Sequence, residues 1–200
     1  VAAEGVHELS SPLDVSGGVS IITGRSSPIP LDYESMKVYI VRHTSVVLDG
    51  NLICYGYSDI DVRPTFVEEA TITRRELEGL CFDGVFSSPL RRARKLATFC
   101  GYPDPITDDR LKEMNFGQWE GRPWSEIIIG EGTEEFFLRY IEEPTPGGES
   151  LRMQYERVRS FLVEKRAEGY QQILVFCHGG VINCARTLAG LCQLEEAYAT

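Results

Sequence analysis

The sequence predicts an α/β fold, a three-layer α/β/α sandwich in which helices cover both faces of a mostly parallel sheet. Short apolar segments at 38–41, 82–88 and 172–177 indicate strands, and the first and last contain almost no polar residue, as in strands buried on both faces. Between these segments, apolar residues recur with helical spacing. Strands that alternate with helices along a chain are typical of parallel sheets.

The remaining elements follow in order along the 200 residues. Residues 1–35, rich in Ser, Gly and Pro, are expected to form a loop-like extension with a short strand at 19–23, and the folded domain to span 36–200. Helices are predicted at 65–80, 90–100, 149–168 and 181–192, helical pieces at 123–142, and a short strand at 104–107. The chain stops just after a helix, and whether a final strand is missing from it stays open.

Charge and cysteine content limit the partners and the compartment. The net charge of −10 argues against a nucleic acid or an anionic membrane surface as partner. No apolar stretch is long enough to span a membrane, and no secretory signal is visible. Six cysteines occur without a CxxC pair, several of them in apolar segments where a free thiol acts as a small core residue. We expect a reduced, cytoplasmic protein, and a homodimer is left open.

Polar side chains follow each of the three apolar strands. Arg42 and His43 end the first strand, a Ser-Ser-Pro segment at 87–89 ends the second, and His178 follows the third. The carboxyl ends of parallel strands meet at one edge of a sheet, where open α/β folds bind ligands. Two histidines and at least two arginines, one of them from the helix after residue 89, are therefore predicted to share a pocket.

This combination of side chains predicts a phosphate site. Guanidinium groups match phosphate oxygens with two parallel hydrogen bonds, and amides at helix starts add to anion binding. A neutral imidazole can attack phosphorus, and nearby guanidinium groups keep it neutral. Each residue alone is more often structural than catalytic, so the prediction depends on their joint placement at strand ends.

Four segments carry a resemblance to a known family. VYIVRHT, SSPLRRARKLA, LKEMNFGQWEG and LVFCHGG occur in this order between residues 36 and 191. Together they resemble the ordered motifs of the histidine phosphatase (phosphoglycerate mutase-like) superfamily. The resemblance implies a phosphoglycerate mutase-like fold and a phosphomonoesterase that acts on a small phosphorylated metabolite through a phosphohistidine, with no metal or organic cofactor.

The resemblance also implies roles for five residues. His43 would be the phosphorylated nucleophile, and Arg42, Arg92 and His178 would bind the phosphate. Glu113 matches the acid/base glutamate of the third motif, and nothing else in the sequence distinguishes it from other surface carboxylates.

The sequence departs from the family pattern after His43. Where the family commonly has glycine, a hydroxyl residue and asparagine, this chain has Thr44, Val46 and Asp49, and we expect Asp49 to point away from the phosphate. The candidate substrate-binding residues are Thr44, Ser45, Tyr55, Gly56 and Gly179. The form RHT…CYGYSD most resembles the α-ribazole-5'-phosphate phosphatase branch, which serves cobalamin synthesis.

Several alternatives stay open at this point. The chain could be a broad-specificity sugar or metabolite phosphatase, a phosphoglycerate mutase, or a non-catalytic phosphate-binding interaction module. The loop at 44–64 is expected to lie over the pocket, and Tyr55, Tyr57, Trp119 and Trp124 would either form aromatic walls for a flat ring or pack in the core. With three histidines in all, a metal site is not expected.

Overall fold

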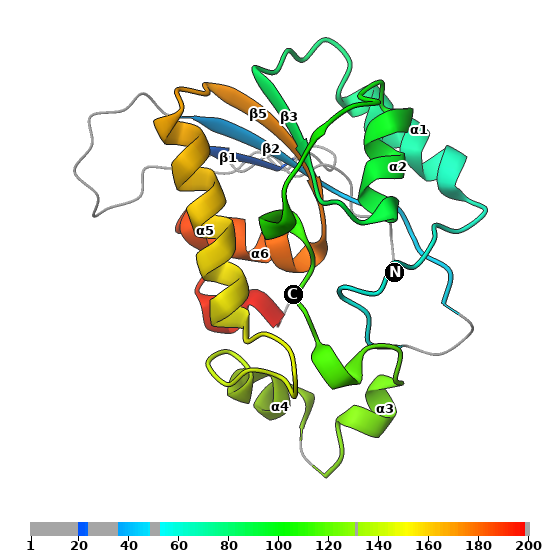
Figure 1. Cartoon of the computed structure of the whole chain (residues 1–200), viewed down its shortest axis with the longest axis vertical. Helices are drawn as coiled ribbons and strands as arrows, with labels where there is room; N and C mark the ends of the chain where they lie inside the picture. Colours follow the sequence, from blue (N-terminus) through cyan, green and yellow to red (C-terminus); the bar gives the residue numbers. More distant parts are fainter. Residues whose placement is uncertain (1–19, 24–35, 49–52, 131, 199–200) are drawn as a thin grey trace.

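The computed structural model describes residues 20–23, 36–48, 53–130 and 132–198. Within these residues the chain forms one five-stranded sheet of order β1-β2-β5-β3-β4 (Figure 1). The strands are β1 (Ser20–Thr23), β2 (Lys37–Arg42), β3 (Gly84–Ser87), β4 (Ile106–Thr107) and β5 (Gln172–Cys177). The pairs β2·β5, β5·β3 and β3·β4 are parallel, and β1 joins β2 as an antiparallel edge strand. The predicted mostly parallel sheet is confirmed.

Helices cover both faces of this sheet, which confirms the predicted sandwich (Figure 1). Helices α1 (Phe66–Glu76) and α2 (Arg91–Phe99) cover one face, and α5 (Leu151–Ala167) and α6 (Gly179–Leu188) cover the other. The short helices α3 (Trp124–Ile127) and α4 (Thr133–Arg139) lie apart from the sheet, as Figure 1 shows. Three 3₁₀ helices complete the described chain, η1 (Asp109–Leu111), η2 (Gly117–Trp119) and η3 (Leu194–Tyr198).

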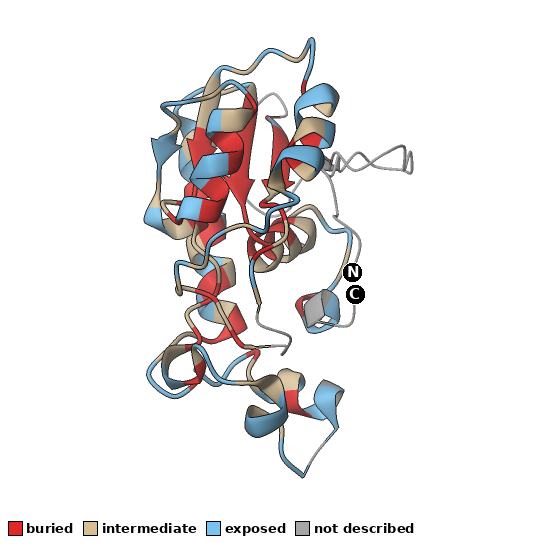
Figure 2. Ribbon diagram, turned by 90° about the vertical axis from the view of Figure 1, so that its right-hand side faces the viewer, coloured by how far each residue is buried: buried red, intermediate tan, exposed pale blue. Residues whose placement is uncertain are grey.

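The neighbouring strands β2 and β5 are buried along almost their whole length, as their apolar sequences predict (Figure 2). In β2, Val38 and Ile40 belong to the core beneath α5 and α6, whereas Tyr39 and Val41 belong to the core beneath α1 and α2. Successive side chains of a strand point to opposite faces, so both cores need apolar residues from the same short segment. Burial of this kind fixes the register of β2 and β5, and with it the place where each strand ends.

A third, smaller core lies around η2, α3 and α4. Trp119 is buried against Phe136 and Tyr140, with ring centroids 5.3 and 4.7 Å away. Trp124 packs edge-on against Phe116, with centroids 5.5 Å apart. Of the two possibilities that the sequence left open for these tryptophans, core packing is the one the structure supports.

Some element boundaries differ from those predicted. The helix expected at 65–80 ends at Glu76, and Gly79 follows with a φ of 79°. The helix expected at 181–192 is α6, which begins at Gly179, with His178 as its N-cap residue, and ends at Leu188. The strand expected at 19–23 is β1. Most of the extension lies outside the described residues, as does Asp49, so the domain boundary stays a prediction.

Candidate active site

The parallel register of β2 and β5 brings His43 and His178 together. Arg42 pairs with Cys177 in the sheet, and the His43 amide donates to the Cys177 carbonyl at 3.1 Å. The two imidazole centroids are therefore 5.2 Å apart. On the other side of β5, the Ser88 amide donates to the Phe176 carbonyl at 2.9 Å, which places the end of β3 at the same edge.

The His43 imidazole is held in one orientation. Its Nδ1 lies 2.7 Å from the carbonyl oxygen of Thr44. Since a carbonyl can only accept, Nδ1 carries the proton of the neutral ring and Nε2 carries the lone pair. Burial, followed by the charge of Arg92 and more weakly by that of Arg42, lowers the pKa of His43 to about 3 against the opposing effect of the Thr44 carbonyl. The ring is thus a neutral potential nucleophile at ordinary pH.

His178 is fully buried at the start of α6. Its Nε2 lies 2.8 Å from the Ser88 hydroxyl oxygen, and its Nδ1 has no partner. Burial, followed by the charges of Arg92 and His43, holds the pKa of His178 well below its usual value. A neutral His178 can accept from Ser88 at Nε2 and present an N–H at Nδ1, a donor suited to an anionic oxygen.

Arg92 is buried in the first turn of α2, at 0 % exposure, and is held by the loop that follows β2. Its two terminal nitrogens donate to the carbonyls of Ser58 and Gly56, each at 2.7 Å, while its Nε is buried without a partner. The Tyr55 ring centroid lies 5.4 Å from the guanidinium carbon. The loop therefore fixes this cation from one side and leaves its Nε without a partner.

Glu120 holds that loop in place. Its carboxylate accepts from the amides of Gly56, Tyr57 and Ser58 at 2.9–3.0 Å, and from the Ser58 hydroxyl. Gly56 has no room for a side chain, because a Cβ there would overlap the Met114 carbonyl oxygen. Sequence reasoning assigned no role to Glu120, although it lies in the same quoted motif as Glu113.

The Glu113 carboxylate sits at the start of α6. Its oxygens accept from the Met114 amide and the Gln154 side chain at 3.0 Å, and from the Gly180 amide at 3.2 Å. A Cβ at Gly180 would overlap Glu113, so the glycine is needed for this approach. Arg92 and Tyr55 lie near enough for the Glu113 charge to affect the pKa of each.

Comparison with known proteins identifies the family. Residues 38–199 match the histidine phosphatase superfamily (branch 1). The chain belongs to this superfamily.

Three relatives illustrate the range of activities within it. "Phosphoserine phosphatase 1" of Hydrogenobacter thermophilus is 31% identical over 147 residues, which cover 70% of this chain and 69% of the relative. The crystal structure of phosphoglycerate mutase from Thermus thermophilus is 30% identical, with a TM-score of 0.59 over 74% of this chain and 81% of that one. "Adenosylcobalamin/alpha-ribazole phosphatase" of Escherichia coli is 28% identical over 160 residues, 74% of this chain and 76% of the relative.

Membership of this superfamily, together with the two relatives named as phosphatases, supports a phosphoric monoester hydrolase. The three relatives act, by their names, on different phosphorylated compounds, so the family does not fix the substrate. Among the described residues, no helix is long and apolar enough to cross a membrane.

The structure places the other predicted binding residues close to this centre, in different settings. Thr44 is buried and its hydroxyl has no partner, whereas the Ser45 amide donates to Glu69 of α1 at 2.8 Å. Tyr55 hydrogen-bonds to Arg42. A Cβ at Gly179 would lie 3.4 Å from the Arg42 guanidinium carbon, an ordinary contact distance, so this glycine lies directly beside the arginine. Their roles in substrate binding stay predictions.

The buried neutral state of His43 leads to a prediction about stability and pH. The folded-state pKa of about 3 lies below the ordinary value of 6.5, so the unfolded chain binds the extra proton first as the pH falls. The stabilisation is complete above about pH 6.5 and is lost on acidification, by ~2 kcal/mol at about pH 5 for this residue.

Urea unfolding in phosphate-free buffer at about pH 7.5 and pH 5 measures this loss. A His43→Asn variant should lose ~2 kcal/mol less between the two pH values than the wild type. An equal loss in both proteins would show that His43 is not held neutral by the fold.

Proposed function

We propose that this histidine phosphatase hydrolyses small phosphomonoesters in two steps, through a phosphohistidine on His43. One observation carries the proposal. Beside an imidazole whose Nδ1 is already engaged, three buried polar atoms have no partner, namely Arg92 Nε, His178 Nδ1 and Thr44 Oγ1. Buried polar atoms without partners are rare in folded proteins and favour a bound ligand that pairs with them. A phosphoryl group offers several acceptor oxygens at once.

In the first step His43 Nε2 forms a bond to phosphorus as the ester P–O bond breaks. Glu113 transfers a proton to the leaving alkoxide oxygen. Arg42, Arg92 and His178 donate to the equatorial oxygens, whose charge must be stabilised in the transition state. In the second step Glu113, now ionised, takes a proton from water, which attacks phosphorus and releases His43 and inorganic phosphate.

The electrostatics around His43 support a nucleophile that needs no base to activate it. Its low pKa follows from burial and from the adjacent guanidinium groups, which oppose the charged form of the ring. The same guanidinium groups attract the phosphate dianion, so one arrangement serves both binding and attack. The intact set of His43, Arg92, Glu113 and His178 favours catalysis over a non-catalytic phosphate-binding role.

α-Ribazole 5'-phosphate is the first substrate candidate. The Escherichia coli relative is named for it, and Tyr55 presents a ring next to Arg92 against which a flat base could pack. Phosphoserine is the second candidate, because a more similar relative is named for it. With Trp119 and Trp124 in the third core, the aromatic argument for the first candidate depends on Tyr55 and Tyr57.

A turnover screen tests both the reaction and the substrate. Purified enzyme is given α-ribazole 5'-phosphate, phosphoserine and 3-phosphoglycerate, and phosphate release is followed alongside isomerisation of the glycerate. We expect phosphate release without isomerisation, and a kcat/KM for α-ribazole 5'-phosphate about tenfold or more above that for 3-phosphoglycerate.

Other outcomes of the screen would change the proposal in defined ways. A mutase must keep water from its phosphoenzyme, so isomerisation faster than phosphate release would replace the phosphatase proposal by a mutase. The highest kcat/KM on phosphoserine would replace the ribazole proposal by the second candidate. Equal values on all substrates would indicate a broad-specificity phosphatase.

The cysteines support a reducing compartment. All six lie within the described residues and all are free thiols, with Cys81 exposed and Cys192 partly exposed. Accessible free thiols persist where the surroundings are reducing. We therefore propose the cytoplasm as the location of the enzyme.

A further inference from the structure

Arg157, in the middle of α5, directs every N–H of its guanidinium at the segment that carries Glu113 or at the carboxylate that holds this segment. One terminal nitrogen donates to the carbonyls of Arg110 and Lys112 at 2.6 and 2.7 Å. The other donates to the carbonyl of Glu113 itself at 2.8 Å and to Glu149 at 3.0 Å. Nε donates to the second Glu149 oxygen at 2.9 Å. An arginine has five such donors, so none is left over.

Glu149 extends this attachment past Glu113. Its carboxylate accepts from the Asn115 amide at 2.9 Å, and its own amide donates to the Asn115 carbonyl at 2.8 Å. The Arg157–Glu149 pair is mostly buried, with side chains 14% and 13% exposed. Main-chain groups on both sides of Glu113 are thus fastened to α5 and to Glu149, which lies two residues before the helix begins.

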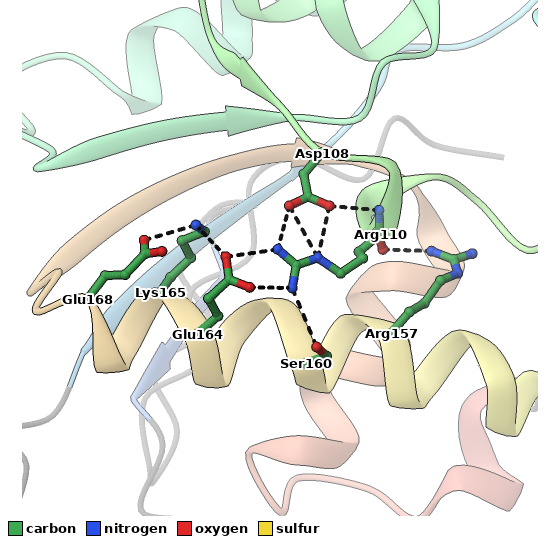
Figure 3. Close-up of polar contacts among 7 residues, drawn as sticks. All are labelled: Asp108, Arg110, Arg157, Ser160, Glu164, Lys165 and Glu168. Atoms are coloured by element: carbon green, nitrogen blue, oxygen red, sulfur yellow. Dashed lines mark hydrogen bonds and ion pairs between the residues drawn. The ribbon is translucent and has the colours of Figure 1, made fainter.

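The network in Figure 3 anchors the other end of the same segment. Arg110, whose carbonyl accepts from Arg157, pairs through its guanidinium with Asp108 at 2.7 Å and with Glu164 of α5 at 2.8 Å. Gln154, one helical turn before Arg157, is fully buried and donates to the Glu113 carboxylate. Helix α5 therefore holds both the backbone and the side chain of Glu113.

We propose that Arg157 is a positioning residue for proton transfer by Glu113. This inference rests on the proposed role of Glu113 as general acid. Proton transfer requires the donor oxygen within hydrogen-bond reach of the ester oxygen, and a displacement of about 1 Å can cost about 10²-fold in rate. An extended loop does not hold a side chain to that accuracy by itself. The Arg157 fork, which has the shape to bind three carbonyls and a carboxylate together, supplies the constraint.

Dependence on the leaving group separates positioning from general structural support. An alkoxide leaving group needs the proton from Glu113, whereas p-nitrophenolate departs readily without it. We measure kcat/KM for glycerol 2-phosphate and for p-nitrophenyl phosphate, because this parameter reports the step in which the ester bond breaks. The variants are Glu113→Gln, Arg157→Met, Arg157→Lys and Glu149→Gln, with Arg152→Met as matched control. Arg152 also lies on α5, pairs with Glu142 at 2.8 Å, and is 40% exposed.

We expect Arg157→Met and Arg157→Lys to lower kcat/KM for glycerol 2-phosphate by about 10- to 100-fold and to change that for p-nitrophenyl phosphate by less than about threefold. Glu149→Gln should show the same pattern as the Arg157 variants, with a larger loss of kcat/KM for glycerol 2-phosphate than for p-nitrophenyl phosphate. Arg152→Met should leave both values within about twofold of the wild type. If Arg157→Met does not fold, the two conservative variants carry the test.

Two outcomes would contradict the inference, and they can be told apart. In the first, Glu113→Gln lowers kcat/KM more for glycerol 2-phosphate than for p-nitrophenyl phosphate, but the Arg157 variants lower kcat/KM equally for both. Arg157 is then structural only, and the inference is wrong. In the second, Glu113→Gln itself lowers kcat/KM equally for both substrates. The proposed acid role of Glu113 then fails, and the role of Arg157 fails with it.

Discussion

Replacing His43 with alanine is expected to abolish phosphatase turnover and covalent phosphorylation of the protein together. The imidazole that would attack phosphorus is held in one orientation, because its Nδ1 is bound to the Thr44 carbonyl and its Nε2 carries the lone pair. Water cannot replace it without a new base, and removal of a catalytic nucleophile typically lowers kcat by on the order of 10⁴-fold or more.

The measurement is trapping of a phosphoenzyme from a substrate labelled in its phosphoryl group. The adduct should be acid-labile and stable in alkali, as expected for phosphohistidine. His178→Ala is the matched control, because that imidazole lies 5.2 Å away and is proposed to bind phosphate without attacking it. It should turn over slowly and still label. Labelling of His43→Ala to the wild-type level would contradict the assignment of the nucleophile.

The sheet and the ends of its central strands could be predicted from the sequence alone. Strands β2 and β5 are short, apolar and contain β-branched residues, and a histidine follows each of them directly, so local pattern and tertiary burial agree. The start of α6 could not be predicted. A Gly-Gly pair ordinarily counts against a helix, but here the Gly180 amide donates to the Glu113 carboxylate, which comes from a segment 67 residues earlier.

The site residues also divide into those that the local sequence pattern predicts and one that depends on distant contacts. His43 and His178 follow from strand ends and sheet geometry, which the sequence pattern carries. Glu113 was found only through the resemblance, because its position depends on Gln154 and Arg157, 41 and 44 residues further along the chain. Contacts at that separation leave no periodic signal in the segment itself. For Trp119 the sequence left two possibilities open, because nothing in the surrounding residues distinguishes the aromatic wall of a pocket from a core residue.

Arg91 and Arg92 are neighbours in α2 and differ almost entirely in their surroundings. Arg92 is fully buried, and its terminal nitrogens are bound to the carbonyls of Gly56 and Ser58. Arg91 has a side chain 61% exposed and pairs with Asp59 at 2.9 Å. Exposed ion pairs contribute little, so a charge-conserving change at each position compares a proposed phosphate ligand with a surface arginine.

Arg92→Lys is expected to lower kcat/KM by about 10²- to 10³-fold, while Arg91→Lys stays within about threefold. A lysine has one nitrogen, which cannot bind two loop carbonyls and also reach the phosphoryl group, whereas the guanidinium can do both. The effect should appear in the inhibition constant of vanadate as well, because vanadate mimics the transferred group.

Thermal unfolding of the two variants shows whether the fold survives, since the Gly56 and Ser58 carbonyls lose donors in Arg92→Lys. If this variant folds and retains both turnover and vanadate inhibition, Arg92 serves only to hold the loop that Glu120 anchors. Arg42 and His178 would then have to stabilise the phosphoryl charge without it.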